Sequence, residues 1–211
     1  MGFFCLGTGR LGFAAEGRLG SMGLGNILFG KKKLGGAKRD RLFALSTAQV
    51  TLEGELGMRP AGVAAVVFKP LSAGEFMRAE QEIDELLGVA AQSSGSKVSR
   101  RTDSLGFEWL VVRDSELEDL VTTVHLVSSE LDARGFGAQL LAALFPFTGR
   151  ERTEYLVYGF KRGTFWPFVP TGKDQERDNP EEMRLKNELE KELPIEPQLE
   201  RWLGLFDAPL S

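Results

Sequence analysis

Short runs of hydrophobic residues, separated by glycine, proline and polar clusters, indicate a chain built largely from strands. The run VAAVVF at residues 63–68, bounded by Pro60 and Pro70, is typical of a buried strand. In a later run Phe107, Trp109 and Val111 share one face while the residues between them share the other, which predicts a strand covered on both sides. The predicted strands are residues 63–68, 97–102, 107–113, 139–145, 153–161 and 164–169.

Helical spacing of apolar residues predicts an amphipathic helix over residues 73–87 and a second from Ser115 to Gly135. The inward stripe of the second consists of Leu117, Leu120, Val121, Val124, Ser128 and Leu131. Capping boxes at Ser46, Ser72 and Ser115 predict the starts of three helices. A short helix over residues 41–45 is predicted to precede the one that starts at Ser46. The run Asn179-Pro180-Glu181-Glu182 predicts a further helix with a cap and a proline in its first turn. Pro194 and Pro197 end that helix and allow a last short one that docks Trp202.

From residue 63 onward the predicted order is β-α-β-β-α-β, followed by a hairpin and helices. This order matches the ferredoxin-like pattern, in which two helices cover one face of an antiparallel sheet. We therefore expect an α+β fold with an antiparallel sheet of about six strands, a ferredoxin-like core, and a C-terminal hairpin and helices. With 211 residues, the chain is long enough for one good core, and we expect a single domain over residues 40–211.

The N-terminal part differs in composition from this domain. The first 36 residues hold eleven of the 25 glycines, which predicts a flexible arm over residues 1–39. Gly7-Thr8-Gly9-Arg10-Leu11-Gly12 matches the dinucleotide-binding pattern G-x-G-x-x-G, but no buried strand precedes it and Gly17 and Gly20 interrupt the helix that should follow, so we expect no cofactor. The residues from Met22 onward have the pattern of a protein N-terminus, which makes residues 1–21 a candidate mis-annotated extension.

Charge is distributed unevenly along the chain. The formal net charge is −4, and because residues 1–41 carry eight basic and two acidic residues, a net of +6, residues 42–211 carry −10. A short apolar cluster followed by lysines is compatible with transient contact with an anionic membrane surface, and a solvated tail is the alternative. The predicted contact residues are Ile27, Leu28, Phe29, Lys31, Lys32 and Lys33. Cys5 is the only cysteine and no apolar run is long enough to span a bilayer, so we expect a cytoplasmic protein, peripheral at most to the inner membrane face.

The residues that usually carry catalysis are scarce. His125 is the only histidine, so one chain can form neither a Ser-His-Asp triad nor a multi-histidine metal centre. We interpret His125 as a partly buried structural residue. The acidic residues fall on predicted outward helix faces or, like Glu176 and Asp178, in a charged loop, and we interpret them as solvated. The sequence thus predicts neither an enzyme nor a metal site.

The last predicted hairpin has the most unusual composition. Aromatic residues beside basic ones predict a partner-binding surface made of Tyr158, Phe160, Lys161, Arg162, Phe165, Trp166 and Phe168. Nucleic acid is not expected there for two reasons. An RNA-recognition motif requires an aromatic residue directly after Arg-Gly, whereas Thr164 follows Arg162-Gly163, and residues 42–211 carry a net negative charge. The alternative is a small-ligand pocket or a carboxylate-based enzyme, with a pocket lined by Trp109, Tyr155, Tyr158 and Trp166.

Several blocks of sequence, in order and at similar spacing, resemble the PspA-associated protein PspAB family of bacteria and archaea. The blocks are residues 41–48 (RLFALSTA), 106–112 (GFEWLVV), 118–125 (EDLVTTVH), 135–141 (GFGAQLL) and 161–168 (KRGTFWPF). The resemblance covers residues 22–211. It implies a context, an envelope-stress system around PspA, which binds the inner face of the cytoplasmic membrane, but no reaction and no catalytic residues. We therefore expect a non-enzymatic accessory or adaptor protein whose partner is a PspA-type protein.

Overall fold

The computed structural model describes residues 36–69, 85, 88, 95–149, 152–173 and 175–210. The chain separates into two compact units, residues 1–30 and 31–211, and every described residue belongs to the second. The glycine pattern at residues 7–12, the predicted membrane-contact residues, the capping box at Ser72 and all but residue 85 of the predicted helix over 73–87 lie outside the described residues.

Within the described residues, seven strands form one antiparallel sheet. They are β1 (Arg59–Pro60), β2 (Val63–Phe68), β3 (Lys97–Thr102), β4 (Glu108–Arg113), β5 (Leu140–Thr148), β6 (Thr153–Gly159) and β7 (Thr164–Phe168). The order is β3-β4-β2-β5-β6-β7, and β1 pairs with β5. The fold is therefore α+β with an antiparallel sheet, and the two-residue β1 is the one strand that the sequence did not predict.

Strand β2 lies in the middle of the sheet because all six of its residues are apolar and can be buried on both faces. The neighbouring order β5-β2-β4-β3 is the one a ferredoxin-like core requires. The helix that should connect β2 to β3 falls largely outside the described residues, so the ferredoxin-like detail remains a prediction.

The long helix α5 (Leu117–Ala133) confirms the predicted stripe, since all six stripe residues are buried. The helix start predicted from a capping box at Ser115 is wrong. Glu116 is the N-cap residue and makes no side-chain cap, and the carboxylate of Asp114 instead accepts a hydrogen bond from the backbone N–H of Glu116 at 3.1 Å. Gly135, with φ of 91°, lets the chain leave the helix as predicted.

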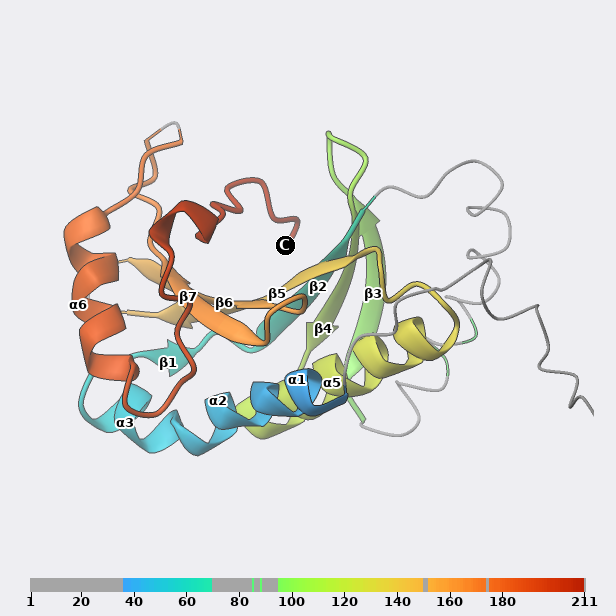
Figure 1. Cartoon of the computed structure of the whole chain (residues 1–211), viewed down its shortest axis with the longest axis horizontal. Coiled ribbons are helices and arrows are strands. Elements are labelled where there is room, and N and C mark those ends of the chain that lie inside the picture. Colours follow the sequence, from blue (N-terminus) through green and yellow to red (C-terminus); the bar gives the residue numbers. More distant parts are fainter. Residues whose placement is uncertain are drawn as a thin grey trace, which may run out of the picture. The chain divides into compact units, whose positions relative to one another are not determined.

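Helical structure begins at Gly36, four residues before the position expected from the sequence. A series of short helices follows: α1 (Gly36–Asp40), η2 (Arg41–Phe43), α2 (Ala44–Thr47) and α3 (Gln49–Gly54). The capping box at Ser46 is also wrong, because α3 begins after Ala48 and the hydroxyl of Ser46 is buried without a hydrogen-bond partner. These helices and α5 lie along one side of the sheet (Figure 1).

The opposite side of the sheet is covered by the C-terminal segment, residues 194–210, which crosses it after helix α6 (Asn179–Leu189) (Figure 1). Its one regular element is the short helix η3 (Leu199–Arg201). The indole N–H of Trp202 donates to the carbonyl of Glu196 at 2.9 Å, and Phe206 packs edge-on against Phe168 with ring centroids 4.9 Å apart. The sheet is thus buried on both faces, each with its own hydrophobic cluster.

Candidate functional site

The five aromatic residues of the predicted partner surface are buried. Tyr158, Phe160 and Phe165 belong to the cluster on the helix side, and Trp166 and Phe168 to the cluster under the C-terminal segment. Successive residues of a strand point to opposite faces, so a strand covered on both sides buries all its aromatic residues. A partner cannot contact these side chains, and this part of the predicted surface is corrected.

The free edge expected at the hairpin is also partly covered. Strand β7, which contains Pro167, is the last in the sheet, but residues 194–196 run beside it. The backbone N–H of Phe165 donates to the carbonyl of Pro194 at 2.8 Å, and the N–H of Glu196 donates to the carbonyl of Phe165 at 2.8 Å. These bonds occupy backbone groups that a partner strand would need.

Two residues of the predicted surface, Lys161 and Arg162, are exposed in the turn between β6 and β7. They lie at the margin of a cleft of about 770 Å³. Its apolar lining consists of Val67, Leu140, Leu141, Ala142, Trp166, Leu203 and Leu205. Its charged lining consists of Lys38, Lys69, Lys161, Arg162, Arg201 and Glu196. We define these residues as the basic cleft, since its lining holds five cations and one carboxylate.

Small residues line the hollow where β5 begins and β6 ends, at Ala142 and Gly159. A β-bulge shifts the register between β2 and β5, so that Val67 pairs with Ala142 and Phe68 with Leu140. A Cβ atom on Gly159 would come within 2.9 Å of the Trp166 ring, so the absence of a side chain leaves room for the indole beside this strand. The indole N–H donates to the carbonyl of Leu203 at 3.1 Å, which holds the C-terminal segment beside the cleft.

Glu196 is 2% exposed and organises the charges of the basic cleft. Its carboxylate accepts hydrogen bonds from the hydroxyl of Thr164 at 3.0 Å and from the N–H of Gln198 at 3.2 Å. The guanidinium groups of Arg162 and Arg201 each lie 3.7 Å from it. One carboxylate between two guanidinium groups leaves the cleft with excess positive charge.

Helix α1 closes one side of the basic cleft through backbone contacts. The ammonium group of Lys38 donates to the carbonyl of Lys161 at 3.0 Å, and the hydroxyl of Tyr158 donates to the carbonyl of Lys38. Burial raises the pKa of Tyr158 above its usual value, so the hydroxyl stays protonated and able to donate. Arg39 in the same helix forms an ion pair with the buried Asp132 of α5.

We predict that Tyr158→Phe loosens α1 without unfolding the domain. The substitution keeps the ring in the core but leaves the Lys38 carbonyl without its donor, which costs about 1 kcal/mol. Limited trypsin digestion after Lys38 and Arg39 should become roughly fivefold faster. Cleavage at Lys191, which is far along the chain in an exposed position, provides the control and should keep its rate. An unchanged rate at Lys38 would contradict a role for this hydroxyl in holding α1.

A family model described as PspA associated protein B matches residues 22–210. The chain belongs to this family. The match starts at Met22, as the resemblance in sequence predicted, and spans every described residue. Comparison with curated proteins and with solved structures gave no match. The family description links the chain to PspA, and the basic cleft is a concave, charged feature of this PspA-associated protein that a ligand or partner can reach.

The four residues expected to line a ligand pocket in this PspA-associated protein do not line the basic cleft together. Only Trp166 lines the basic cleft. The indole N–H of Trp109 donates to Asp103 at 2.9 Å, and Tyr155 packs against Phe168 with ring centroids 5.6 Å apart. Sequence reasoning missed the lysines at positions 38 and 69, Arg201 and Glu196, which come from distant segments and carry no shared motif.

His125 lies on α5, where its ring packs against Phe43 at 4.8 Å and its Nε2 is 3.1 Å from a carboxylate oxygen of Asp40. These contacts fit the structural role predicted for it. In the part of the chain that the structure describes, no group of three histidine, cysteine or acidic residues could hold a metal ion. Over the same residues, no helix is both long and apolar enough to cross a membrane.

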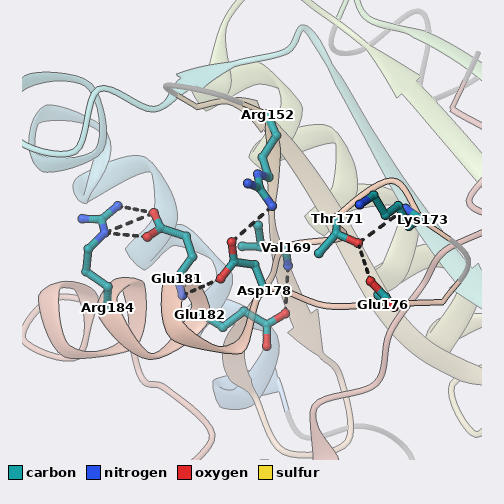
Figure 2. A network of polar contacts seen from close by, with 9 residues as sticks. All are labelled: Arg152, Val169, Thr171, Lys173, Glu176, Asp178, Glu181, Glu182 and Arg184. Carbon is teal, nitrogen blue, oxygen red and sulfur yellow. Dashed lines mark hydrogen bonds and ion pairs between the residues drawn. The ribbon is translucent and has the colours of Figure 1, made fainter.

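The acidic residues around the start of α6 are not simply solvated, which corrects the interpretation of Asp178. Its carboxylate accepts from the N–H of Glu181 at 3.1 Å, which makes it the cap of α6 in place of Asn179, and it pairs with Arg152 at 3.1 Å (Figure 2). Glu182 turns inward and accepts from the N–H of Val169 at 2.9 Å. The carboxylate of Glu176 accepts a hydrogen bond from the hydroxyl of Thr171 within its own loop (Figure 2), in agreement with the predicted charged loop.

Proposed function

We propose that this chain is a non-enzymatic accessory protein of the PspA membrane-stress response that acts by contact with a PspA-type protein at the inner membrane face. The observation that carries the proposal is the family match over residues 22–210, whose description names association with PspA. In this proposal the protein acts by binding its partner and not by catalysing a reaction.

The contact surface we propose is centred on Lys161 and Arg162. Both side chains are exposed at the end of the β6–β7 hairpin, which is fixed in place by the covered edge of β7 and by the docked Lys38. A rigid turn that presents two cations favours an acidic partner surface, because complementary charge increases association rates and disfavours wrong partners. The basic arm, with Lys31, Lys32 and Lys33, is proposed to add transient contact with anionic lipid.

Co-sedimentation of the full chain with anionic vesicles tests this function. We expect the chain to sediment when the PspA-type protein of the same organism is present, and to remain in the supernatant with vesicles alone at physiological salt. Sedimentation that is equally efficient without that protein would replace partner recruitment by direct lipid binding. No sedimentation under either condition, with the PspA-type protein itself in the pellet, would overturn the proposal.

A pair of matched variants tests the surface. Lys161→Glu/Arg162→Glu should weaken binding to the PspA-type protein about tenfold, or about 1.4 kcal/mol. Lys97→Glu/Arg101→Glu changes the net charge equally, but on β3 at the opposite edge of the sheet, and should leave binding unchanged. Equal losses in both variants would show that only net charge matters and would contradict the assigned surface.

The presence of the basic cleft favours a second function, the binding of a small ligand. Its volume of about 770 Å³ lies within the roughly 300–1,000 Å³ of ordinary ligand sites, and it combines an apolar lining with a few converging polar groups.

A further inference from the structure

We propose that the basic cleft binds a long-chain fatty acid, with the acyl chain on the apolar floor and the carboxylate among the cations at the margin. This inference goes beyond the proposed association with PspA and does not depend on it. Three features of the cleft lead to it: the aliphatic floor, the hollow left by small residues, and the excess of positive charge in an otherwise acidic body.

The floor is apolar and reaches the surface. Val67 and Trp166 form its base on the sheet, and Leu203 and Leu205 of the C-terminal segment form one wall. Leu203 is 59% exposed, which is unusual for a leucine beside a concavity. An acyl chain laid against these side chains would remove their apolar surface from water. Because each buried methylene strengthens binding about fourfold, or about 0.8 kcal/mol, a chain gains affinity with length as long as the floor extends.

The shape favours a slender ligand over a helix of a partner protein. The cleft is enclosed by the loop at Gly137 and Ala138, the turn from Gly159 to Arg162, and the C-terminal segment. An α-helix with side chains is about 10–12 Å wide and needs a groove that is open along several turns. A hollow of about 770 Å³ bounded by three chain segments suits a single small molecule better.

The charges select an anionic head group. Lys38, Lys69 and Lys161 are exposed at the cleft, and Arg162 and Arg201 share the single buried carboxylate of Glu196. At 3.7 Å from Glu196, neither guanidinium group makes a short bidentate contact with it, so donors remain for a second carboxylate. Since residues 42–211 carry a net charge of −10, this cluster is a local reversal of sign rather than a reflection of the whole surface.

Titration of the full chain with a series of fatty acids tests the proposal. Decanoate, dodecanoate and tetradecanoate would be added below their critical micelle concentrations, with binding followed by calorimetry and by tryptophan fluorescence. We expect 1:1 binding in which each step of two carbons lowers Kd about fifteenfold until the floor is filled. Dodecanol should bind at least tenfold more weakly than dodecanoate, and added salt should reduce that difference. The absence of saturable binding, or a Kd independent of chain length, would overturn the proposal.

Variants locate the ligand. Ala138→Trp places an indole at an exposed position of the cleft wall and should weaken dodecanoate binding at least tenfold, and Leu203→Ser should weaken it severalfold. Leu105→Ser removes another exposed leucine, 71% accessible in the β3–β4 turn, and should not change dodecanoate binding. Lys161→Glu should weaken binding and Lys97→Glu should not. Thermal unfolding of each variant verifies that the fold is retained.

The outcomes separate this proposal from association with PspA. Dodecanoate binding that responds to Ala138→Trp supports the ligand site whether or not the PspA-type protein binds. If dodecanoate fails to bind while Ala138→Trp and Leu203→Ser abolish co-sedimentation with the PspA-type protein, the fatty-acid proposal is overturned and the cleft is a docking site for that protein.

Discussion

The double variant Phe165→Ala/Trp166→Ala is expected to be largely unfolded at room temperature. Phe165 is fully buried against the helices and Trp166 is 5% exposed under the C-terminal segment. Each truncation costs about 3–5 kcal/mol, and because the two side chains lie on opposite faces of β7 the costs should add. The sum of about 6–10 kcal/mol compares with a typical total stability of about 5–15 kcal/mol.

Urea unfolding followed by circular dichroism measures this loss, with each single variant as an intermediate step. Val50→Ala/Leu105→Ala truncates two aliphatic residues that are 82% and 71% exposed, and serves as the control, which should unfold within about 0.5 kcal/mol of the unmodified chain. A double variant at positions 165 and 166 that unfolds at the same urea concentration as this control would show that the aromatic residues are not part of the core.

The Phe165→Ala/Trp166→Ala variant is therefore unsuitable for mapping a partner surface. A loss of partner binding in the Phe165→Ala/Trp166→Ala variant would report an unfolded domain rather than a damaged surface. The exposed cations Lys161 and Arg162 are therefore the informative positions on this hairpin.

The sequence predicted the sheet well because strand burial leaves a strong local pattern. Residues 63–68 are apolar without interruption and β2 is buried on both faces, and α5 shows the predicted stripe because its spacing needs no knowledge of distant residues. The helix starts were predicted poorly. Ser46 and Ser115 fit a capping box by spacing, but the start of a helix also depends on where the preceding chain is held. Before α5, for example, the carboxylate of Asp114 accepts a hydrogen bond from the hydroxyl of Ser96.

The aromatic residues of the predicted partner surface were misjudged as accessible for a related reason. An aromatic strand at a sheet edge is exposed or buried depending on what covers it. Here the helices cover one face, and residues 194–210, a largely irregular segment without periodicity, cover the other. The basic cleft likewise could not be found from sequence, because Lys38, Lys69 and Arg201 line one cleft only through the docking of α1 and of the C-terminal segment. Local spacing predicts elements, whereas this site is made by long-range packing.

The second large effect concerns Glu182, whose substitution by alanine is expected to cost about 3–5 kcal/mol. Its carboxylate is 2% exposed and accepts from the N–H of Val169 and from Nε of Arg177, both at 2.9 Å. Arg177 in turn donates to the carbonyl of Trp202, and its guanidinium lies 5.2 Å from the centre of the Phe168 ring. Removal of Glu182 leaves a buried N–H without its acceptor and a largely buried cation without its partner.

Glu181 provides the matched control, because it is the adjacent residue of the same helix and also pairs with an arginine. Figure 2 shows Glu181 directed toward Arg184 while Glu182 is directed toward Val169. Because the Glu181–Arg184 pair is partly exposed, Glu181→Ala should cost about 1 kcal/mol or less.

Urea unfolding of the two glutamate variants, combined with a double-mutant cycle between Glu182→Ala and Arg177→Ala, measures how strongly the pair is coupled. We expect a coupling energy of about 1–3 kcal/mol, because both substitutions disrupt one chain of contacts from α6 through Arg177 to Trp202. That chain fixes the C-terminal segment over the sheet, so Glu182→Ala should also increase proteolysis near residues 203–210, whereas Glu181→Ala should not. Equal stability of the two glutamate variants would mean that the C-terminal segment is held by its apolar contacts alone, with no contribution from this buried carboxylate.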